Sequence, residues 1–263
     1  MQYDLIIRNG TIIDGSGRKR YQGDIAVRGA VIEEIGNLNS AESAREIDAQ
    51  GKIVCPGFID IHSHVDFAIA DRHHAARLEP LIRQGITTMI GGAQGKGPFD
   101  ALCDLLLEEN GQVMVFHTLL APDDPFAFRS MWAGFTHPMA VPATDTILRP
   151  IGRPAHVFYD CFPRFIAFFT KEKPLLSLEE AVRKCTSLPA ALMRLKHRGT
   201  LQKGHFADIT VFDHAALKTT ATFHSPAVFP SGIEHVIING RPVLAAGELK
   251  KDMMAGTVIR RTD

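Results

Sequence analysis

Short apolar runs separated by turn dipeptides occupy both ends of the chain. Near the N-terminus these runs cover residues 5–7, 11–13, 24–27 and 31–35, and the pairs between them are Asn9-Gly10, Asp14-Gly15 and Arg28-Gly29. Near the C-terminus the runs cover residues 208–212, 233–238, 242–244 and 257–260. Such runs are typical of β-strands joined by tight turns. We therefore expect residues 1–55 and 200–263 to form one β-domain around a central insert.

The centre of the chain has a different pattern. Residues 75–83 predict a helix, residues 86–90 a buried strand, and residues 99–109 a second helix with leucines on one side. Alternation of strands and helices favours a parallel α/β architecture. Ser177 and Glu180 have capping-box spacing, which predicts a helix from Ser177 to about residue 187, before Pro189.

Charge and composition restrict the partners of the chain. It has 29 Lys plus Arg and 29 Asp plus Glu, so the formal net charge of zero offers no attraction to nucleic acid or to an anionic membrane. An acidic residue lies at position 4, and no segment reaches the roughly 18 apolar residues of a membrane span. We expect a cytoplasmic protein with a small-molecule partner, and a homo-oligomer is left open. The chain has four cysteines, Cys55, Cys103, Cys161 and Cys185. They are widely spaced and form no Cys-x-x-Cys pair, which favours reduced thiols over disulfides or a structural zinc site.

The stretch 55–66 combines an apolar strand pattern with side chains that bind metals. Because successive side chains of a strand point to opposite faces, Asp60, His62, His64 and Asp66 share one face. Two imidazoles at this spacing can bind one divalent ion, and flanking aspartates can orient them by hydrogen bonds. Chance His-x-His pairs occur on surfaces and in cores, but this pair follows an apolar strand, which favours a metal site.

With this motif in place, the chain resembles the amidohydrolase superfamily, and within it the N-acyl-D-amino-acid deacylases, or D-aminoacylases. The residues that carry the resemblance are 4–17, 51–64, 85–88, 177–190, 198–199, 204–213 and 236–240. The resemblance implies a (β/α)₈ barrel with a zinc site, and a β-sandwich built from both termini. It also implies that His62 and His64 bind one or two divalent ions. Asp145, at the end of a last barrel strand over residues 137–145, would bind the metal and shuttle protons.

Four features depart from the family pattern. A complete barrel takes roughly 250 residues. The central segment, residues 56–199, is much shorter than this. We therefore expect an α/β fold in which an incomplete, metal-dependent TIM-type barrel is inserted in the terminal β-sandwich, with a junction near residues 92–96. Gln94 stands where the family has a metal-bridging cysteine, and Val157 where it has an arginine for the substrate carboxylate. Thr146 replaces the glycine that follows the catalytic aspartate.

Three side chains near Val157 are candidates for binding substrate: His156, Tyr159 and Arg164. For Tyr159 and Arg164 a structural role is equally consistent with the sequence, because neighbouring phenylalanines indicate a packed helix. His117, after an apolar run, offers a replacement metal ligand, although a single histidine in that position is usually structural.

The predicted activity is zinc-dependent hydrolysis of a non-peptide C–N amide bond, as in an N-acyl-D-amino-acid deacylase. A bound divalent ion lowers the pKa of its water toward roughly 7, and Asp145 would pass the water proton to the leaving amine. One alternative is a cyclic-amide hydrolase of the dihydroorotase or hydantoinase type. Another is an inactive scaffold that dimerises through strand edges left exposed by the shortened barrel.

Overall fold

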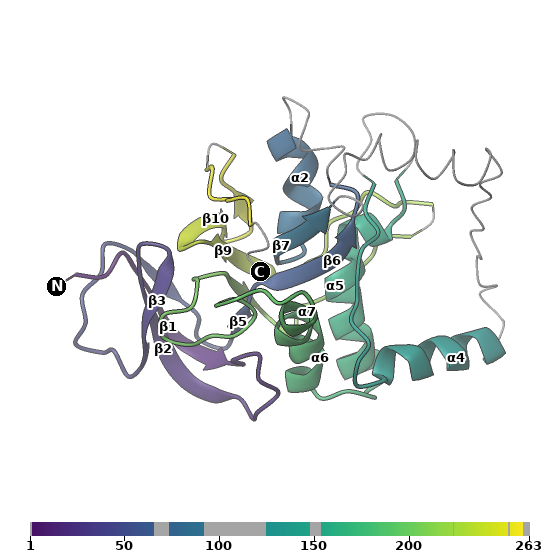
Figure 1. The fold of residues 1–263 in the computed structure, drawn as a ribbon, viewed down its shortest axis with the longest axis horizontal. Coiled ribbons are helices and arrows are strands. Elements are labelled where there is room, and N and C mark those ends of the chain that lie inside the picture. Colours follow the sequence, from purple (N-terminus) through teal and green to yellow (C-terminus); the bar gives the residue numbers. More distant parts are fainter. Residues whose placement is uncertain are drawn as a thin grey trace.

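A computed structural model describes residues 2–65, 74–91, 125–147, 154–222, 224–251 and 253–259. Figure 1 shows the N-terminal strands at one side of the molecule, the helices α5, α6 and α7 beside the short strands β6 and β7, and helix α4 reaching away from them. Gln94, the expected helix over residues 99–109, Cys103 and His117 lie outside the described residues, as does Asp66.

Eleven strands and six helical segments make up the described part of the chain. The strands are β1 (Leu5–Ile12), β2 (Tyr21–Arg28), β3 (Val31–Gly36), β4 (Glu46–Asp48), β5 (Ile53–Pro56), β6 (Phe58–Ser63), β7 (Ile86–Gly91), β8 (Ile209–Phe212), β9 (Ile233–Ile238), β10 (Arg241–Ala245) and β11 (Glu248–Leu249). The helices are α2 (His74–Ile82), α4 (Pro125–Thr136), α5 (Val157–Ala167), the π-helix η1 (Phe168–Glu172), α6 (Leu178–Cys185) and α7 (Ser187–Leu192). None of these helices is both long and apolar enough to cross a membrane.

Both ends of the chain contribute to one large sheet. Its strand order is β11-β10-β9-β8-β5-β1-β2-β3, and β4 pairs with β1. The two ends meet where β5 pairs antiparallel with β8, Ile53 opposite Phe212 and Cys55 opposite Thr210. The repeated strand pattern at the two ends thus corresponds to a shared sheet. The division into residues 1–55 plus 200–263 and residues 56–199 stays a prediction.

Two local expectations for this sheet are wrong. Asn9-Gly10 is not a turn, because β1 continues through it with a shift in its pairing to β2. Asn9 has a φ of 59°, and a Cβ on Gly10 would lie 2.5 Å from the Val54 side chain, so a glycine allows the strands to pass. The expected strand at residues 257–260 is also not found in the described residues 257–259. There Val258 is exposed and has no buried face that would hold a strand in place.

Strands β6 and β7 form a separate parallel pair, with Phe58 opposite Ile86, and α2 lies between them in the chain. The chain passes from β5 to β6 at Gly57, where an added Cβ would lie 2.1 Å from the Thr87 side chain. Only glycine fits there. This crossing connects the large sheet directly to the strand that carries the histidine motif.

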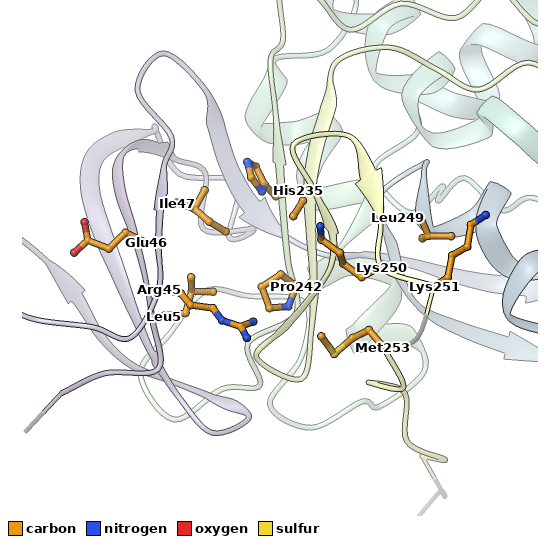
Figure 2. A pocket seen from close by; sticks show the side chains of 11 residues that line it. Leu5, Arg45, Glu46, Ile47, His235, Pro242, Leu249, Lys250, Lys251 and Met253 are labelled. Carbon is orange, nitrogen blue, oxygen red and sulfur yellow. The ribbon is translucent and has the colours of Figure 1, made fainter.

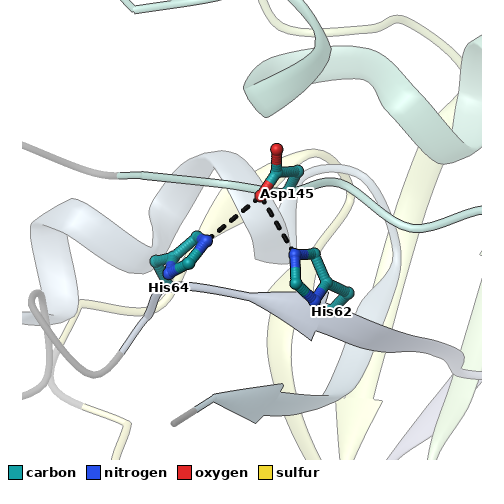
Figure 3. Close-up of side chains that lie close together, drawn as sticks. All are labelled: His62, His64 and Asp145. Atoms are coloured by element: carbon teal, nitrogen blue, oxygen red, sulfur yellow. Dashed lines mark hydrogen bonds and ion pairs between the residues drawn. The ribbon is translucent and has the colours of Figure 1, made fainter. Parts of the chain in front are cut away.

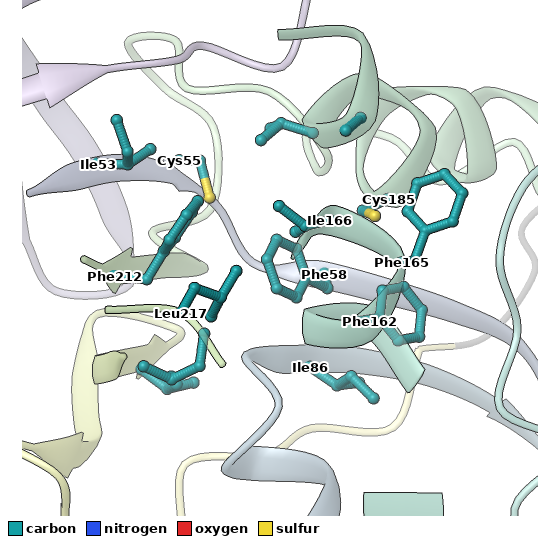
Figure 4. Close-up of a cluster of buried hydrophobic side chains, with 14 of the residues drawn as sticks. Ile53, Cys55, Phe58, Ile86, Phe162, Phe165, Ile166, Cys185, Phe212 and Leu217 are labelled. Carbon is teal, nitrogen blue, oxygen red and sulfur yellow. The ribbon is translucent and has the colours of Figure 1, made fainter. Parts of the chain in front are cut away.

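A shared core covers both sheets. Phe58 of β6 stacks on Phe162 of α5, with ring centroids 5.7 Å apart, and contacts Phe212 of β8 at 6.5 Å. Figure 4 shows these rings together with Cys55 and Cys185 in one buried cluster. The helices α5 and α6 thus pack β6 against the large sheet, which gives the motif strand a rigid base.

The helix predicted from Ser177 divides into two. Ser177 caps α6 by accepting a hydrogen bond from the Glu180 backbone N–H at 3.1 Å, as predicted. The Glu180 carboxylate pairs with Arg183. Thr186 leaves the helical conformation, and α7 then begins at Ser187 with Pro189 in its first turn. Pro189 is tolerated there because the first-turn N–H groups of a helix have no helical acceptor.

A groove of about 910 Å³ lies between β4 and the β9–β11 strands (Figure 2). Apolar side chains such as Ile47, Pro242 and Leu249 line it, together with His235. None of the histidine-motif residues lines this groove. The motif instead lies at the open end of β6.

Candidate metal centre

Three side chains meet at the end of β6. His62 is the second-last residue of the strand, His64 follows the strand, and Asp145 comes from the segment 140–147. The Nε2 atoms of His62 and His64 each lie 3.2 Å from the same oxygen, Oδ1 of Asp145. Figure 3 shows both rings pointing at this carboxylate. One ligating atom from each residue lies within 4.8 Å of the others.

These separations fit a shared metal ion. Ligand atoms about 2.0–2.1 Å from a tetrahedral zinc lie roughly 3.3 Å from one another, close to the 3.2 Å between each imidazole nitrogen and the carboxylate oxygen. Two imidazoles and one carboxylate are also a donor set that catalytic zinc sites use. The side chains of His62, His64 and Asp145 are 64%, 40% and 57% exposed, so water and a substrate can reach this position.

The segment that carries Asp145 is not the strand expected over residues 137–145. The described residues 140–147 have no strand assignment. Pro138 and Pro142 lack the backbone N–H that a strand ladder requires, and Asp145 has a φ of 50°, outside the extended region. The segment nevertheless follows β6, because the Asp145 N–H donates to the His62 carbonyl at 3.0 Å and the His64 N–H donates to the Thr146 carbonyl at 2.8 Å.

Asp60 has a different role from the expected contact with an imidazole. It is fully buried, and it accepts hydrogen bonds from the Thr144 hydroxyl at 2.5 Å and the Thr144 N–H at 3.2 Å. The His62 N–H donates to the same carboxylate at 3.3 Å. Burial raises the pKa of Asp60, and these hydrogen bonds oppose that shift. Asp60 therefore connects β6 to the residue directly before Asp145.

The three candidate substrate residues lie on or just before α5 and have partners within the protein. Arg164 donates to the buried Asp160 carboxylate and to the Ala221 carbonyl at 2.7 Å. His156 Nδ1 lies 3.5 Å from Asp160 Oδ1, without hydrogen-bond geometry. The Tyr159 ring packs on Phe229 with centroids 5.6 Å apart. None of the three candidates belongs to the cluster of potential metal ligands found among the described residues, and a substrate role for α5 stays a prediction.

Two residues that support the site had no signal in the sequence. Thr144 contacts Asp60 across 84 positions of the chain, and no local pattern encodes such a contact. Lys184 has the position of a polar residue on an amphipathic helix, yet it is fully buried. Its ammonium donates to the His137 carbonyl and, at 3.0 Å, to the Ala140 carbonyl. Both contacts join segments that lie far apart in the sequence, so only the folded chain reveals them.

Comparison with known proteins adds three findings. A model of the amidohydrolase family matches residues 45–119 and 128–244. A D-aminoacylase of Alcaligenes xylosoxydans xylosoxydans is 41% identical over 110 residues, which are 42% of this chain and 22% of that protein. An N-acyl-D-glutamate deacylase of the same organism is 42% identical over 92 residues, 35% of this chain and 18% of that protein. The matched stretches are thus less than a quarter of these relatives.

The structural comparison extends further along the chain. The crystal structure of an N-acyl-D-glutamate deacylase from Bordetella bronchiseptica, complexed with zinc and a phosphonate inhibitor, superimposes with a TM-score of 0.76. The superposition covers 92% of this chain and 97% of that chain at 19% sequence identity. At this identity the likeness concerns the fold alone.

Proposed function

Because the chain belongs to the amidohydrolase family, we propose that it is a metal-dependent hydrolase of C–N amide bonds, of the N-acyl-D-amino-acid deacylase type. The observation that carries this proposal is the meeting of His62, His64 and Asp145 at an exposed strand end, where each imidazole Nε2 lies 3.2 Å from the same carboxylate oxygen. The D-aminoacylase and N-acyl-D-glutamate deacylase sequence matches support the choice of amide bond.

In the proposed site His62, His64 and Asp145 would hold a divalent ion, and this set of two imidazoles and one carboxylate suits zinc. Such an ion, when bound, makes hydroxide available near neutral pH. Asp145 accepts the proton of the attacking water on its carboxylate and later delivers it to the leaving amine nitrogen. The exposure of Asp145 matches this task, because the carboxylate must reach both water and substrate.

The proposed substrate is a small N-acyl amino acid or a related amide. His156, just before α5, and Tyr159 and Arg164 on α5 remain candidates for contacting it. Val157 begins α5 and has no charge with which to bind a carboxylate. We therefore expect free N-acyl-D-amino acids to be hydrolysed poorly and amides without a free carboxylate to be tolerated. Cyclic amides are the alternative substrate class, and a family fold alone does not separate the two.

The proposed architecture is an incomplete TIM-type barrel inserted in a β-sandwich from both termini. The parallel pair β6–β7 with α2 between them supports the barrel part, and the β5–β8 pairing supports the terminal part. In this proposal one or two divalent ions lie at the end of β6. An inactive scaffold is the rival, favoured by the small number of assigned ligands.

Metal content and hydrolysis of the purified full chain test the proposal together. We expect about one zinc or more per chain, and hydrolysis of N-acetyl-D-amino acids or their amides that a chelator abolishes and zinc restores. His62→Ala and His64→Ala should lose zinc, whereas His197→Ala, an exposed histidine outside the site, should keep it. Asp145→Asn should lower turnover by roughly 10²–10⁴-fold, because it removes the general base.

Protein without bound zinc and without hydrolysis of linear or cyclic amides would contradict the hydrolase proposal and favour the scaffold. Faster turnover of hydantoin or dihydrouracil than of every linear amide would support a hydrolase but assign its substrates to the cyclic-amide class.

A further inference from the structure

We propose that Thr144 is a positioning residue that, together with Asp60, sets the carboxylate of Asp145 against His62 and His64. This inference rests on the proposed metal site and concerns what holds it in shape. Neither Thr144 nor Asp60 is one of the three converging ligands, and both lie beneath them in the protein interior.

The Thr144 hydroxyl connects the two arms of the site. It donates to Asp60 Oδ2 at 2.5 Å, and it accepts from the Thr146 N–H at 3.1 Å. Thr144 and Thr146 flank Asp145 on either side. A hydroxyl has one proton and two acceptor lone pairs, so this single group can connect β6 with both neighbours of Asp145. No apolar side chain can replace both of these contacts.

The backbone at Asp145 needs this support. Its φ of 50° lies in the left-handed region, which is unfavourable for a residue with a Cβ and persists where surrounding contacts determine it. The hydrogen bond from Thr146 to the Thr144 hydroxyl spans this residue and closes a tight local turn. The hydrogen bond from the Asp145 N–H to the His62 carbonyl connects this turn directly to β6.

Burial separates the supporting layer from the reactive one. Asp60, Thr144 and Thr146 are at most 1% exposed, whereas the ligating side chains above them are exposed to 40% or more. A buried carboxylate requires hydrogen-bond donors, and Thr144 supplies Asp60 with two of them. The same bonds that stabilise the buried charge therefore fix the distance between the two arms of the site.

The predicted effect is on metal binding. Residues that orient metal ligands typically change metal affinity by about 10–100-fold when they are replaced. Thr144→Val keeps the side-chain shape and removes the hydroxyl, so we expect zinc affinity to fall by roughly this factor. Thr144→Ser keeps the hydroxyl and should restore affinity close to that of the unmodified chain. Asp60→Asn retains one acceptor oxygen and should lie between the two.

The matched control is Thr186→Val. Thr186 is also fully buried, and its hydroxyl donates to the Val182 carbonyl of α6 and not to Asp60 or Asp145. The experiment uses the full chain and measures zinc affinity by chelator competition, the visible spectrum of the cobalt-substituted protein, and Tm. We expect Thr144→Val to weaken zinc and to alter the cobalt spectrum, and Thr186→Val to do neither at a comparable change in Tm.

A second readout needs no metal. Hydrogen exchange at the Asp145 and Thr146 amides of the metal-free protein should be faster in Thr144→Val than in the unmodified chain or in Thr144→Ser, because the turn loses its closing contact. If the unmodified chain binds no zinc, the proposed function fails, and this exchange comparison alone decides the positioning role. Unchanged exchange, or equal zinc affinity in Thr144→Val and the unmodified chain, would overturn the inference. An equal loss of affinity in Thr186→Val would overturn it as well.

Discussion

At the scale of single residues, Arg164 pairs with the buried Asp160, so its charge stabilises the protein interior. The Asp160 carboxylate is fully buried, and the Arg164 guanidinium is its charged partner. The same guanidinium donates to the Ala221 carbonyl. A carboxylate without solvent needs such donors, because leaving a buried charge unpaired is costly.

Arg164→Gln should therefore destabilise the fold before it changes substrate recognition. We expect a loss of roughly 2–3 kcal/mol in the free energy of unfolding, below the 3–5 kcal/mol of a fully buried pair, because the Arg164 side chain is 39% exposed. Urea denaturation measures it, with Arg45→Gln at the surface as the control. An unchanged free energy of unfolding with a raised KM for carboxylate substrates would instead assign Arg164 to the substrate.

The residue scale also separates what the sequence can predict from what it cannot. The alternation along β6 predicts that His62 and His64 share a face, because strand geometry is local. The prediction of Asp145 as a ligand rests on the resemblance to a family, because no pattern near it in the chain indicates a ligand. The contact of Thr144 with Asp60 was predicted by neither route, because it depends on how two distant segments pack.

At the scale of elements, α6 determines where the segment carrying Asp145 lies. Lys184 of α6 donates to the His137 and Ala140 carbonyls, and Arg183 of α6 donates to the Pro138 carbonyl at 3.2 Å. These carbonyls lie in the turn that follows the end of α4, where the His137 carbonyl also accepts from the Ala140 N–H. The two cations add donors to this turn and complement the negative end of the helix dipole.

Lys184→Met should loosen this connection while it keeps most of the side-chain volume. We expect a loss of about 1–3 kcal/mol in the free energy of unfolding, the range for buried acceptors left without their donor. Amide exchange in residues 137–147 should become faster. Lys196→Met, at an exposed position, is the control for a change of charge alone. Exchange rates that match the control would show that α6 does not hold this segment.

Some helix and strand boundaries are predictable from local sequence patterns, and others are not. The cap at Ser177 was predictable because a hydroxyl three residues before a glutamate is a local pattern. The split between α6 and α7 was not, because Thr186 leaves the helix without a glycine or proline at its own position. The segment before Asp145 resembles a barrel strand in sequence, but Pro138 and Pro142 prevent it from donating to a regular ladder.

At the scale of the whole molecule, one buried cluster joins the terminal sheet to the parallel pair. Cys55 of β5, Phe58 of β6, Phe212 of β8 and Cys185 of α6 all belong to it. The sequence predicted that both ends are strands, but the common core depends on tertiary packing and was not predictable from local pattern. Because the two sheets share these side chains, we expect them to unfold in one cooperative transition.

Two buried thiols in this shared core should make the free energy of unfolding depend on pH in the alkaline range. Burial raises the pKa of the Cys55 and Cys185 thiols well above the ordinary value of a cysteine. Below about pH 8.5 these thiols are protonated in both states and contribute nothing to the pH dependence. Above it the unfolded chain releases their protons and the folded chain does not. Stability is therefore lost as pH rises, by about 1.4 kcal/mol per pH unit for each thiol.

The measurement is the free energy of unfolding in urea between pH 7 and 9.5 under reducing conditions. Cys185→Ala should lower stability at every pH because it leaves a cavity, but its curve should fall less steeply above pH 8.5, by the slope of one thiol. Lys184, whose pKa burial lowers, contributes with the opposite sign, since its unfolded form holds the proton more tightly. Both proteins retain Lys184, so its contribution cancels in the comparison. Parallel curves for the two proteins would show that the Cys185 thiol ionises in the folded chain, and that the core around it admits water.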